Sequence, residues 1–460
     1  MMRIYSTLSR QLETIEPLNP PSVTIYTCGP TVYDYPHIGN WFTFIRYDLL
    51  IRTIEASGMT PHWVMNVTDV GHLTSDADEG EDKLEKGARR EGKTAWDIAE
   101  YYTDYFIQGL NRLNFKTPWQ LPKATDHIAE QIDMIKRLEA KGYTYKLDDG
   151  LYYDTAKFPD YQKFARLDID EQQTGTRIET NPAKHNPSDF ALWKFSPRTK
   201  KRDMEWDSPW GKGFPGWHIE CSAMCLKYLG ETIDIHCGGI DHIPIHHTNE
   251  IAQSQAVTDK PLANIWMHTN HILINDQKIS KSLGNSLTLE QIEEQGISLE
   301  AFRLYVLESH YRSQSKFSWE GLQAAQNRLL RYKNFAIRRF QIQPDNAQEI
   351  AAPDILKPMQ DDLNTPEALA AIESFINQSE AKPISIQSIE RAIKAIDAIL
   401  GLNLQATNDI NDAQKQLIMR RDRARQDRDW HQADAIRDEL AAQNIGLNDK
   451  NDLSAWYYLK

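Results

Sequence analysis

Cysteine is scarce in this chain of 460 residues, which contains four. So few thiols exclude a disulfide scaffold, and in a reducing compartment clustered thiols serve metals or stay buried as small apolar groups. No apolar run approaches the ~20 residues of a membrane helix, and the first residues lack the apolar core of a signal peptide. We therefore expect a cytoplasmic protein with no membrane partner.

Positive charge is also in deficit, because 52 Lys and Arg residues face 65 Asp and Glu residues, for a net charge of -13. This balance argues against indiscriminate nucleic-acid binding, although a local basic face can still bind a polyanion. The hydrophobic content of 40% and charged content of 25% are ordinary for a globular protein. The chain shows no internal repeat, and its length suits about three domains.

The N-terminal part predicts a βαβ unit. Residues 23–27 alternate and are β-branched, which favours a strand, and residues 62–68 form a second strand candidate. Between them, residues 40–58 carry apolar side chains at helical spacing, with Gly58 placed as the C-terminal cap. A strand, a helix and a strand in succession predict a parallel, doubly wound, Rossmann-like sheet.

The sheet pattern is interrupted and then returns. Amphipathic helical patterns cover residues 83–113 and 124–141, and a hairpin turning at Asp149-Gly150 follows. Residues 160–188 are polar and predict loops, whereas residues 232–236 and 266–275 again resemble strands. We therefore expect one α/β domain split by an insertion. From about residue 298 the pattern is almost entirely helical and predicts a bundle with a small terminal unit.

Residues 216–250 concentrate potential metal ligands, since they hold three of the four cysteines and five of the 14 histidines. Cys221 is followed by His246 and Glu250, and Cys28 lies far upstream. If the fold brings Cys28 back, the chain has two thiolates, one imidazole and one carboxylate, a set that Zn²⁺ prefers at neutral pH.

Spacing alone leaves other ligands open. Cys225 lies one helical turn beyond Cys221 and is a rival, as is Cys237. Either His242 or His247 can replace His246 on composition. On a helix that includes Glu250, His246 would lie about 40° away and His247 about 60° away, so geometry favours His246 only slightly.

Two further motifs suit phosphate. In PHIGN, residues 36–40, His37 can donate a hydrogen bond to a phosphate oxygen at a helix N-terminus, and Gly39 allows a base or ribose to approach closely. In KISKS, residues 278–282, Lys278 and Lys281 can reach a triphosphate, and Gly284 permits movement. Alone, the first is compatible with an ordinary turn and the second with a solvated charged loop.

The order and separation of these motifs resemble the HIGH and KMSKS signatures of class I aminoacyl-tRNA synthetases. Asn40 replaces the second histidine and Ile279 replaces the methionine. Because Asn40 can still donate a hydrogen bond, we expect a retuned site rather than an inactive one.

Cys28 before PHIGN, the segment GWHIECSAM with Cys221, and HHTNEIAQS with His246 and Glu250 together resemble the cysteinyl-tRNA synthetase family along the whole chain. The resemblance implies that these four residues bind one zinc ion, which recognises the thiol of the amino acid. It decides for His246, and it includes neither Cys225 nor Cys237.

The resemblance also implies the reaction: ATP-dependent activation of L-cysteine to cysteinyl-adenylate and transfer to the 3′ end of tRNA(Cys), with Mg²⁺ arriving on ATP. We expect a monomer. Zinc would supply discrimination against serine and alanine that apolar packing cannot, so no editing domain is required. The catalytic candidates are His37, Asn40, Lys278 and Lys281. The candidates for ATP binding are His37, Gly39, Asn40 and Lys281, and those for cysteine binding are Cys28, Gly29, Thr68, Trp217 and Asp241.

The expected organisation follows the family. It comprises the first half of the catalytic domain (1–115), an inserted connective region (116–200), the second half with KISKS (201–297), a stem-contact and helical bundle domain (298–405) and an anticodon-binding unit (406–460). Residues 328–340 are rich in arginine, and Arg421, Arg425 and Arg428 are spaced to share a helical face. Such stripes suit an RNA backbone. The candidates for tRNA contact are Arg331, Arg338, Arg421 and Arg425.

Trp430 in the terminal unit can either stack on a base or fill a small core, and we favour the core. Two other functions are compatible with part of the pattern. A cysteine ligase with an amino-sugar acceptor predicts a shorter C-terminus, and a zinc hydrolase or non-catalytic zinc module does not explain KISKS. The acidic residues 76–82 depart from the family form and receive no role.

Overall fold

A computed structural model describes residues 1–71, 82–165, 182–197, 202–274, 277–279, 286–341, 346–450 and 453–460. The chain forms two compact units. Unit 1 comprises Met1–Leu289, Tyr311–Lys316 and Gln360–Leu363, and unit 2 comprises Glu290–His310, Phe317–Met359 and Asn364–Lys460. Among the helices of the described residues, none has the length and apolar character required to cross a membrane.

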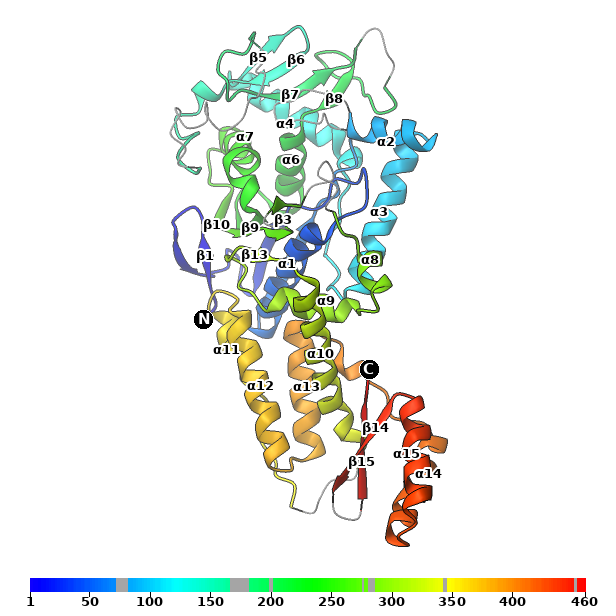
Figure 1. Ribbon diagram of the computed structural model, residues 1–460. Helices are drawn as coiled ribbons and strands as arrows, with labels where there is room; N and C mark the ends of the chain where they lie inside the picture. The colour runs from blue at the N-terminus through cyan, green and yellow to red at the C-terminus, as the bar shows by residue number, and fades with distance from the viewer. Residues whose placement is uncertain are drawn as a thin grey trace. The chain divides into compact units, whose positions relative to one another are not determined.

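Unit 1 is built on a four-stranded sheet in which every neighbouring pair is parallel (Figure 1). Its order is β10-β9-β3-β4, from β3 (Ser22–Thr27), β4 (Thr60–Met65), β9 (Ile233–Gly239) and β10 (Ala263–Thr269). Ile25 of β3 lies between Ile235 and Trp63 in the register. The predicted doubly wound sheet is therefore confirmed, with its two halves joined at β3 and β9.

The crossovers leave the middle of the sheet in opposite directions. Helix α1 (Ile38–Ala56) connects β3 to β4, whereas η3 (Ile240–His242), the π-helical turn η4 (Ile243–His247) and α7 (Thr248–Thr258) connect β9 to β10. Right-handed crossovers in opposite directions cover opposite faces and leave a switch point at the carboxyl ends of the two central strands. Residues that follow β3 and β9 therefore meet at one edge.

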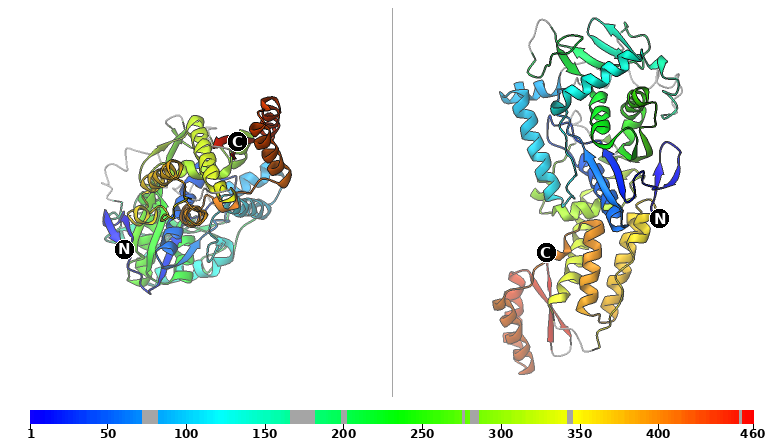
Figure 2. Two further views of the ribbon diagram at one scale, coloured as in Figure 1. Left: turned by 90° about the horizontal axis from the view of Figure 1, so that it is seen from below. Right: turned by 180° about the vertical axis from the view of Figure 1, so that it is seen from behind.

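A long insertion separates the two halves of the sheet. It contains an antiparallel sheet of order β5-β6-β7-β8, which is grouped at one end of unit 1 (Figure 2). Its elements are α2 (Lys83–Glu91), α3 (Ala95–Arg112), η1 (Ala124–His127), α4 (Ile128–Ala140), β5 (Thr144–Leu147), β6 (Gly150–Tyr153), η2 (Thr155–Lys157), β7 (Phe190–Phe195), β8 (Gly213–Pro215) and α6 (Trp217–Leu229).

The predicted hairpin exists, but its turn is displaced. Leu147 pairs with Gly150, so Asp148 and Asp149 form the two-residue turn instead of Asp149 and Gly150. Gly150 is needed inside the strand, because an added Cβ would lie 2.5 Å from the carbonyl oxygen of Trp193. Part of the loop region predicted for residues 160–188 lies outside the described residues.

Three short strands in unit 1 follow the main sheet. They are β11 (Ile272–Ile274), β12 (Gln277–Lys278) and β13 (Ser315–Lys316), in the order β12-β11-β13. The N-terminal hairpin is formed by β1 (Arg3–Ser6) and β2 (Gln11–Thr14).

Unit 2 is largely helical, as predicted, but it ends in a hairpin that the sequence did not reveal. Strands β14 and β15 pack with α14 and α15 around a small core that includes Ile436, Leu440 and Trp456. Trp430 is 59% exposed, so the expectation that it fills this core is wrong. The elements are α8 (Leu289–Glu294), α9 (Leu299–Leu307), α10 (Trp319–Ala336), η6 (Ile337–Phe340), α11 (Leu356–Gln360), α12 (Thr365–Ala381), α13 (Ile386–Leu400), η7 (Leu404–Ala406), α14 (Asp412–Gln426), α15 (Trp430–Ala442), β14 (Ile445–Lys450) and β15 (Leu453–Tyr458).

Candidate metal and nucleotide site

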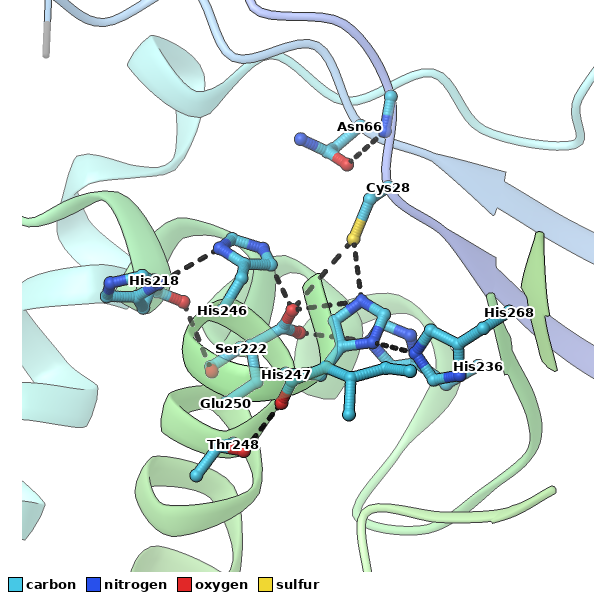
Figure 3. Close-up of polar contacts among 12 residues, drawn as sticks. Cys28, Asn66, His218, Ser222, His236, His246, His247, Thr248, Glu250 and His268 are labelled. Atoms are coloured by element: carbon cyan, nitrogen blue, oxygen red, sulfur yellow. Dashed lines mark hydrogen bonds and ion pairs between the residues drawn. The ribbon is translucent and has the colours of Figure 1, made fainter. Parts of the chain in front are cut away.

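Four buried side chains that the sequence marked as ligands lie together at the switch point. Cys28 follows β3, Cys221 lies in α6, His246 in η4 and Glu250 in α7, and their donor atoms are all within 4.8 Å of one another. Cys28 Sγ lies 3.9 Å from Glu250 Oε1, and His246 Nε2 lies 2.9 Å from the same oxygen. We name this set the four-donor cluster; Figure 3 shows three of its members converging.

The four-donor cluster fits the requirements of a zinc site. With bonds of about 2.0–2.3 Å, donors around a tetrahedral Zn²⁺ lie about 3.3–3.8 Å apart, close to the separations found here. A hydrogen bond from Cys28 lowers the pKa of the Cys221 thiol to about 7, against the effect of burial. The thiolate of Cys221, which is the form that binds metal, is therefore accessible near neutral pH, whereas burial and the bond to Cys221 raise the pKa of Cys28, whose proton a metal would displace.

The carboxylate and imidazole of the cluster hold each other in their charged forms. Burial raises the pKa of Glu250, but His236 and His246 hold it well below its usual range. Burial likewise lowers the pKa of His246, yet Glu250 and Cys221 raise it to about 10. A bound metal would replace the proton on His246, so metal uptake and proton release are coupled at this site.

A second set of donors comprises Cys28, His236 and His247. His247 Nε2 lies 3.3 Å from Cys28 Sγ, and its Nδ1 lies 2.7 Å from His268 Nε2. His236 Nε2 lies 3.0 Å from Glu250 Oε2. This set shares Cys28 with the four-donor cluster and has three donors, so the larger cluster is the better zinc candidate.

Of the four alternative ligands that spacing left open, His247 belongs to the second set, and Cys225, Cys237 and His242 lie outside both sets. Cys225 and Cys237 are buried, and burial raises the pKa of both thiols, which disfavours thiolate. Burial lowers the pKa of His242 to about 4. Within the part of the chain that the structure describes, neither group of potential ligands contains these three residues.

Two residues from the start of α6 support His246. The Nδ1 atoms of His218 and His246 lie 2.9 Å apart, so one donates to the other and Nε2 of His246 is turned toward Glu250 (Figure 3). The ring of Trp217 has its centroid 4.5 Å from that of His246 and forms a wall beside it. Trp217 was singled out from the sequence, whereas His218 was not, although it lies inside GWHIECSAM.

Asn66 organises two of the residues predicted to bind the amino acid. Its Oδ1 accepts a hydrogen bond of 2.9 Å from the amide of Gly29, and its Nδ2 donates to Thr68 Oγ1 over 3.1 Å. A Cβ on Gly29 would lie 1.8 Å from the carbonyl oxygen of Asn66, so the position requires glycine. Thr68 also shares a side-chain hydrogen bond with buried Glu220. Sequence reasoning missed Asn66 and Glu220, although the latter directly precedes Cys221.

Asp241 lies in η3, immediately after β9. Its Oδ1 lies close to Gly239, because a Cβ added to this glycine would come within 2.4 Å of the oxygen. The carboxylate is thus at the carboxyl edge of the sheet, on the same side as the other residues predicted to bind cysteine.

The PHIGN loop begins α1 with a reciprocal cap. Asn40 Oδ1 accepts from the amide of His37 over 3.0 Å, and His37 Nδ1 accepts from the amide of Asn40 over 3.3 Å. Because Nδ1 is an acceptor, the proton of a neutral His37 is on Nε2. A Cβ on Gly39 would lie 3.0 Å from the His37 ring, so glycine at this position avoids a tight contact with that ring.

The segment that leads into and out of KISKS lies against PHIGN. The amide of Ile38 donates to the carbonyl of Leu287 over 2.8 Å, and Ile279 Cδ1 lies 3.4 Å from the position of a Cβ on Gly39. Lys281 lies outside the described residues, and only the backbone of Lys278, at the end of β12, is described.

The arginines proposed for RNA contact are engaged within unit 2. Arg331 bonds Glu373, Asn377 and Glu380, and Arg338 bonds Ser379. Arg421 is 5% exposed and bonds Asp449, whose Oδ1 also lies 3.2 Å from Arg425 Nη1. Arg428 follows the end of α14 with a φ of 60°, so the prediction that Arg421, Arg425 and Arg428 share one helical face is wrong.

Comparison with known proteins identifies the family. The family model described as tRNA synthetases class I (C) catalytic domain matches residues 14–327, and the cysteinyl-tRNA ligase anticodon binding domain matches residues 407–454. Cysteine–tRNA ligase 1 of Burkholderia lata is 46% identical over 456 residues, covering 97% of this chain and 95% of that protein. Cysteine–tRNA ligase of Treponema denticola is 40% identical over 490 residues, covering 99% of each.

Among solved structures, Mycobacterium tuberculosis methionyl-tRNA synthetase bound by methionyl-adenylate has a TM-score of 0.60 at 14% identity. The match covers 84% of this chain and 93% of that one, and it supports the class I fold. The resemblance seen in the sequence is thus confirmed by relatives that span nearly the whole chain. The chain belongs to the cysteine–tRNA ligase family of class I aminoacyl-tRNA synthetases.

Proposed function

We propose that this protein activates L-cysteine with ATP and transfers the cysteinyl group to the 3′ end of tRNA(Cys), with zinc selecting the substrate thiol. The observation that carries the proposal is the position of the four-donor cluster. Two halves of one parallel sheet bring it to the same edge at which PHIGN lies against the segment bearing KISKS. Ligands of doubly wound sheets bind at such an edge.

Cys28, Cys221, His246 and Glu250 would hold the ion. When bound, zinc supplies a soft Lewis acid that accepts a thiolate far better than a hydroxyl, which separates cysteine from serine by ligand chemistry. His218 keeps the His246 ring in one orientation, and Trp217 packs beside it.

The first step needs positioning more than a general base. The cysteine carboxylate attacks the α-phosphorus of ATP, pyrophosphate leaves, and a mixed anhydride with AMP results. The Nε2 proton of His37 can be donated to a phosphate oxygen, while the reciprocal cap with Asn40 fixes the ring. Asp241 would receive the ammonium of the amino acid. Lys278 and Lys281 would bind the phosphates, with Mg²⁺ carried by ATP.

In the second step a hydroxyl of the terminal adenosine attacks the activated carbonyl, and AMP leaves. The terminal unit would bind the distant part of the tRNA. Trp430, exposed at the start of α15, offers a surface on which a base can stack. Contact by Arg331, Arg338, Arg421 and Arg425 stays a prediction, as do the monomeric state and the cytoplasmic location. A match to an anticodon-binding domain over residues 407–454 disfavours the amino-sugar ligase.

The test is cysteine-dependent exchange of pyrophosphate into ATP by zinc-loaded protein, followed by charging of tRNA(Cys). We expect exchange with cysteine and little with serine, and charging of the tRNA. A folded, zinc-loaded sample in which cysteine triggers no exchange would refute the proposal. Exchange without charging would instead favour another acceptor.

A further inference from the structure

A buried arginine on α1 connects the two motifs that we assign to ATP. Arg46 follows PHIGN on the same helix and is 2% exposed. Its Nη1 donates to the carbonyl of Tyr311 over 3.0 Å and lies 3.4 Å from the carbonyl of Asn270. The guanidinium also lies over the ring of Phe42, 3.9 Å from its centroid. Arg46 is therefore fixed between its own helix and two backbone segments.

The carbonyls of Tyr311 and Asn270 lie just before strands of the small sheet β12-β11-β13, whose strand β12 leads into KISKS. Asn270 joins β10 to β11, and β11 pairs with β12, which ends at Lys278. The carbonyl of Tyr311 also accepts from the amide of Asn270 over 2.8 Å. Four residues further on, Ser315 begins β13, the other neighbour of β11. One guanidinium thus donates to Asn270, two residues before β11, and to Tyr311, four residues before β13.

The far side of KISKS is held by the same helix. The amide of Ile38 donates to the carbonyl of Leu287, which follows KISKS in the chain. On the other side, Arg46 Nη1 donates to the carbonyl of Asn270, which precedes KISKS. Since α1 begins with PHIGN, a single helix contacts the chain on both sides of KISKS, at Asn270 before it and at Leu287 after it, and presents the other motif itself. The relative position of the two motifs consequently depends on α1.

A buried cation at this position loses its hydration, and an apolar side chain would avoid that cost in free energy. Burial lowers the pKa of Arg46 to about 9, so ionisation of the group is disfavoured there. Replacement of buried charges by well-packed apolar groups is often neutral or stabilising in proteins. The guanidinium donates to both carbonyls through Nη1 while its planar group lies over the ring of Phe42, and this combination supplies a reason to have arginine here.

We propose that Arg46 is a positioning residue for ATP: it holds the start of the β12-β11-β13 sheet against α1, so that the strand leading into KISKS keeps its place beside the helix that begins with PHIGN. This inference rests on the proposed function. It predicts that a change at Arg46 affects ATP and leaves the metal and the amino acid alone, because the four-donor cluster is formed by other elements.

The test is Arg46→Lys, which keeps the charge and loses the planar guanidinium that lies over Phe42 and reaches both carbonyls. Since misplacement by 1 Å can cost about 100-fold in rate, we expect kcat/KM for ATP in pyrophosphate exchange to fall by about 10- to 100-fold. The KM for cysteine and the zinc content should stay within about twofold of the parent protein. Arg52→Lys is the matched control, because Arg52 is buried on the same helix but bonds Asp48 over 2.6 Å.

A second variant covers the case in which Arg46→Lys does not fold. Asn270→Ala removes the bonds that Asn270 makes to Arg312 and His271 at the same junction, and it should also weaken ATP use selectively. Unchanged ATP kinetics in a folded Arg46→Lys protein would overturn the inference, as would unchanged kinetics in Asn270→Ala if Arg46→Lys does not fold. Equal losses for ATP, cysteine and zinc would do so too, as they indicate a general structural role. Absence of exchange in the parent protein would instead refute the proposed function.

Discussion

His37 and Asn40 satisfy each other's backbone amide at the first turn of α1, through bonds of 3.0 and 3.3 Å. The asparagine that departs from the HIGH signature is therefore part of the helix cap. Asn40 supplies an acceptor to the backbone amide of the N-cap residue, and this bond helps to fix the entry of the chain into α1. The cap also sets the tautomer of His37 and leaves Nε2 as its donor.

Asn40→Ala removes one half of this cap. We expect a loss of about 1 kcal/mol in the free energy of unfolding, which is typical for a lost cap residue, and a higher KM for ATP. Thermal unfolding and pyrophosphate exchange measure the two effects. Asn40→Asp is the control, because a carboxylate keeps the acceptor and suits the helix dipole but repels a triphosphate. It should keep stability and still raise the KM for ATP; a stable alanine variant with parental kinetics would contradict the assignment.

Cys221→Ser tests the four-donor cluster. Loss of groups that merely support a ligand costs about 10- to 100-fold in metal affinity, so loss of the thiolate should cost at least about 100-fold. Zinc content after dialysis and the exchange ratio for cysteine over serine should fall together. Cys225→Ser is the matched control, one turn along α6, buried and outside both donor sets. Retention of zinc and of selectivity by Cys221→Ser would remove Cys221 from the site.

The sequence predicted the parts of the fold that depend on local patterns. The strands β3 and β4 and the helix between them were recognisable because β-branched alternation and helical spacing are local properties. Cys28, Cys221 and Glu250 were identified by residue type and resemblance. The choice of His246 over His247 depended on the resemblance, because η4 is a π-helical turn, in which ideal α-helical angles do not apply.

The errors concern features that depend on distant partners. Trp430 was assigned to a core that is in fact closed by Trp456 from β15, and that hairpin was not predicted because the second half of β14, residues 448–450, is polar and charged and resembles a turn. Hydrogen bonds such as the one between His218 and His246 join segments far apart in sequence, so periodicity carries no information about them. Spacing likewise assigned Arg421 to a basic face that suits RNA. Its side chain is instead buried and bonds Asp449 of β14 and Ser454 of β15, which follow it in the chain.

Glu220 predicts a specific pH dependence of stability. Burial, and next the negative charge of Asp69, raise the pKa of its carboxyl well above the usual range. The folded state therefore holds a proton that the unfolded state has released above about pH 4.3. Stability should fall as the pH rises above that value, by up to about 1.4 kcal/mol per pH unit, until the pH reaches the raised pKa. Glu220→Gln should remove this contribution, as seen by comparing denaturant unfolding of zinc-loaded samples between pH 5 and 8. A slope equal to that of the parent protein would show that Glu220 is ionised in the folded state.

Arg421 provides a test of structural against RNA-binding roles in the terminal unit. Its Nη1 and Nη2 bond the two oxygens of Asp449 over 2.6 and 3.0 Å, and Nη1 also bonds Ser454 Oγ, so it joins α14 to both strands of the hairpin. Asp449 is partly solvated, which screens the pair, and we expect Arg421→Met to destabilise the terminal unit by about 1–3 kcal/mol. Arg420→Met, at the adjacent exposed position, is the control and should leave unfolding unchanged. Local unfolding is measured by hydrogen exchange of β14 and β15, and the KM for tRNA(Cys) by charging. A normal exchange pattern with a raised KM in Arg421→Met would mean that Arg421 contacts the RNA directly, as the sequence first suggested.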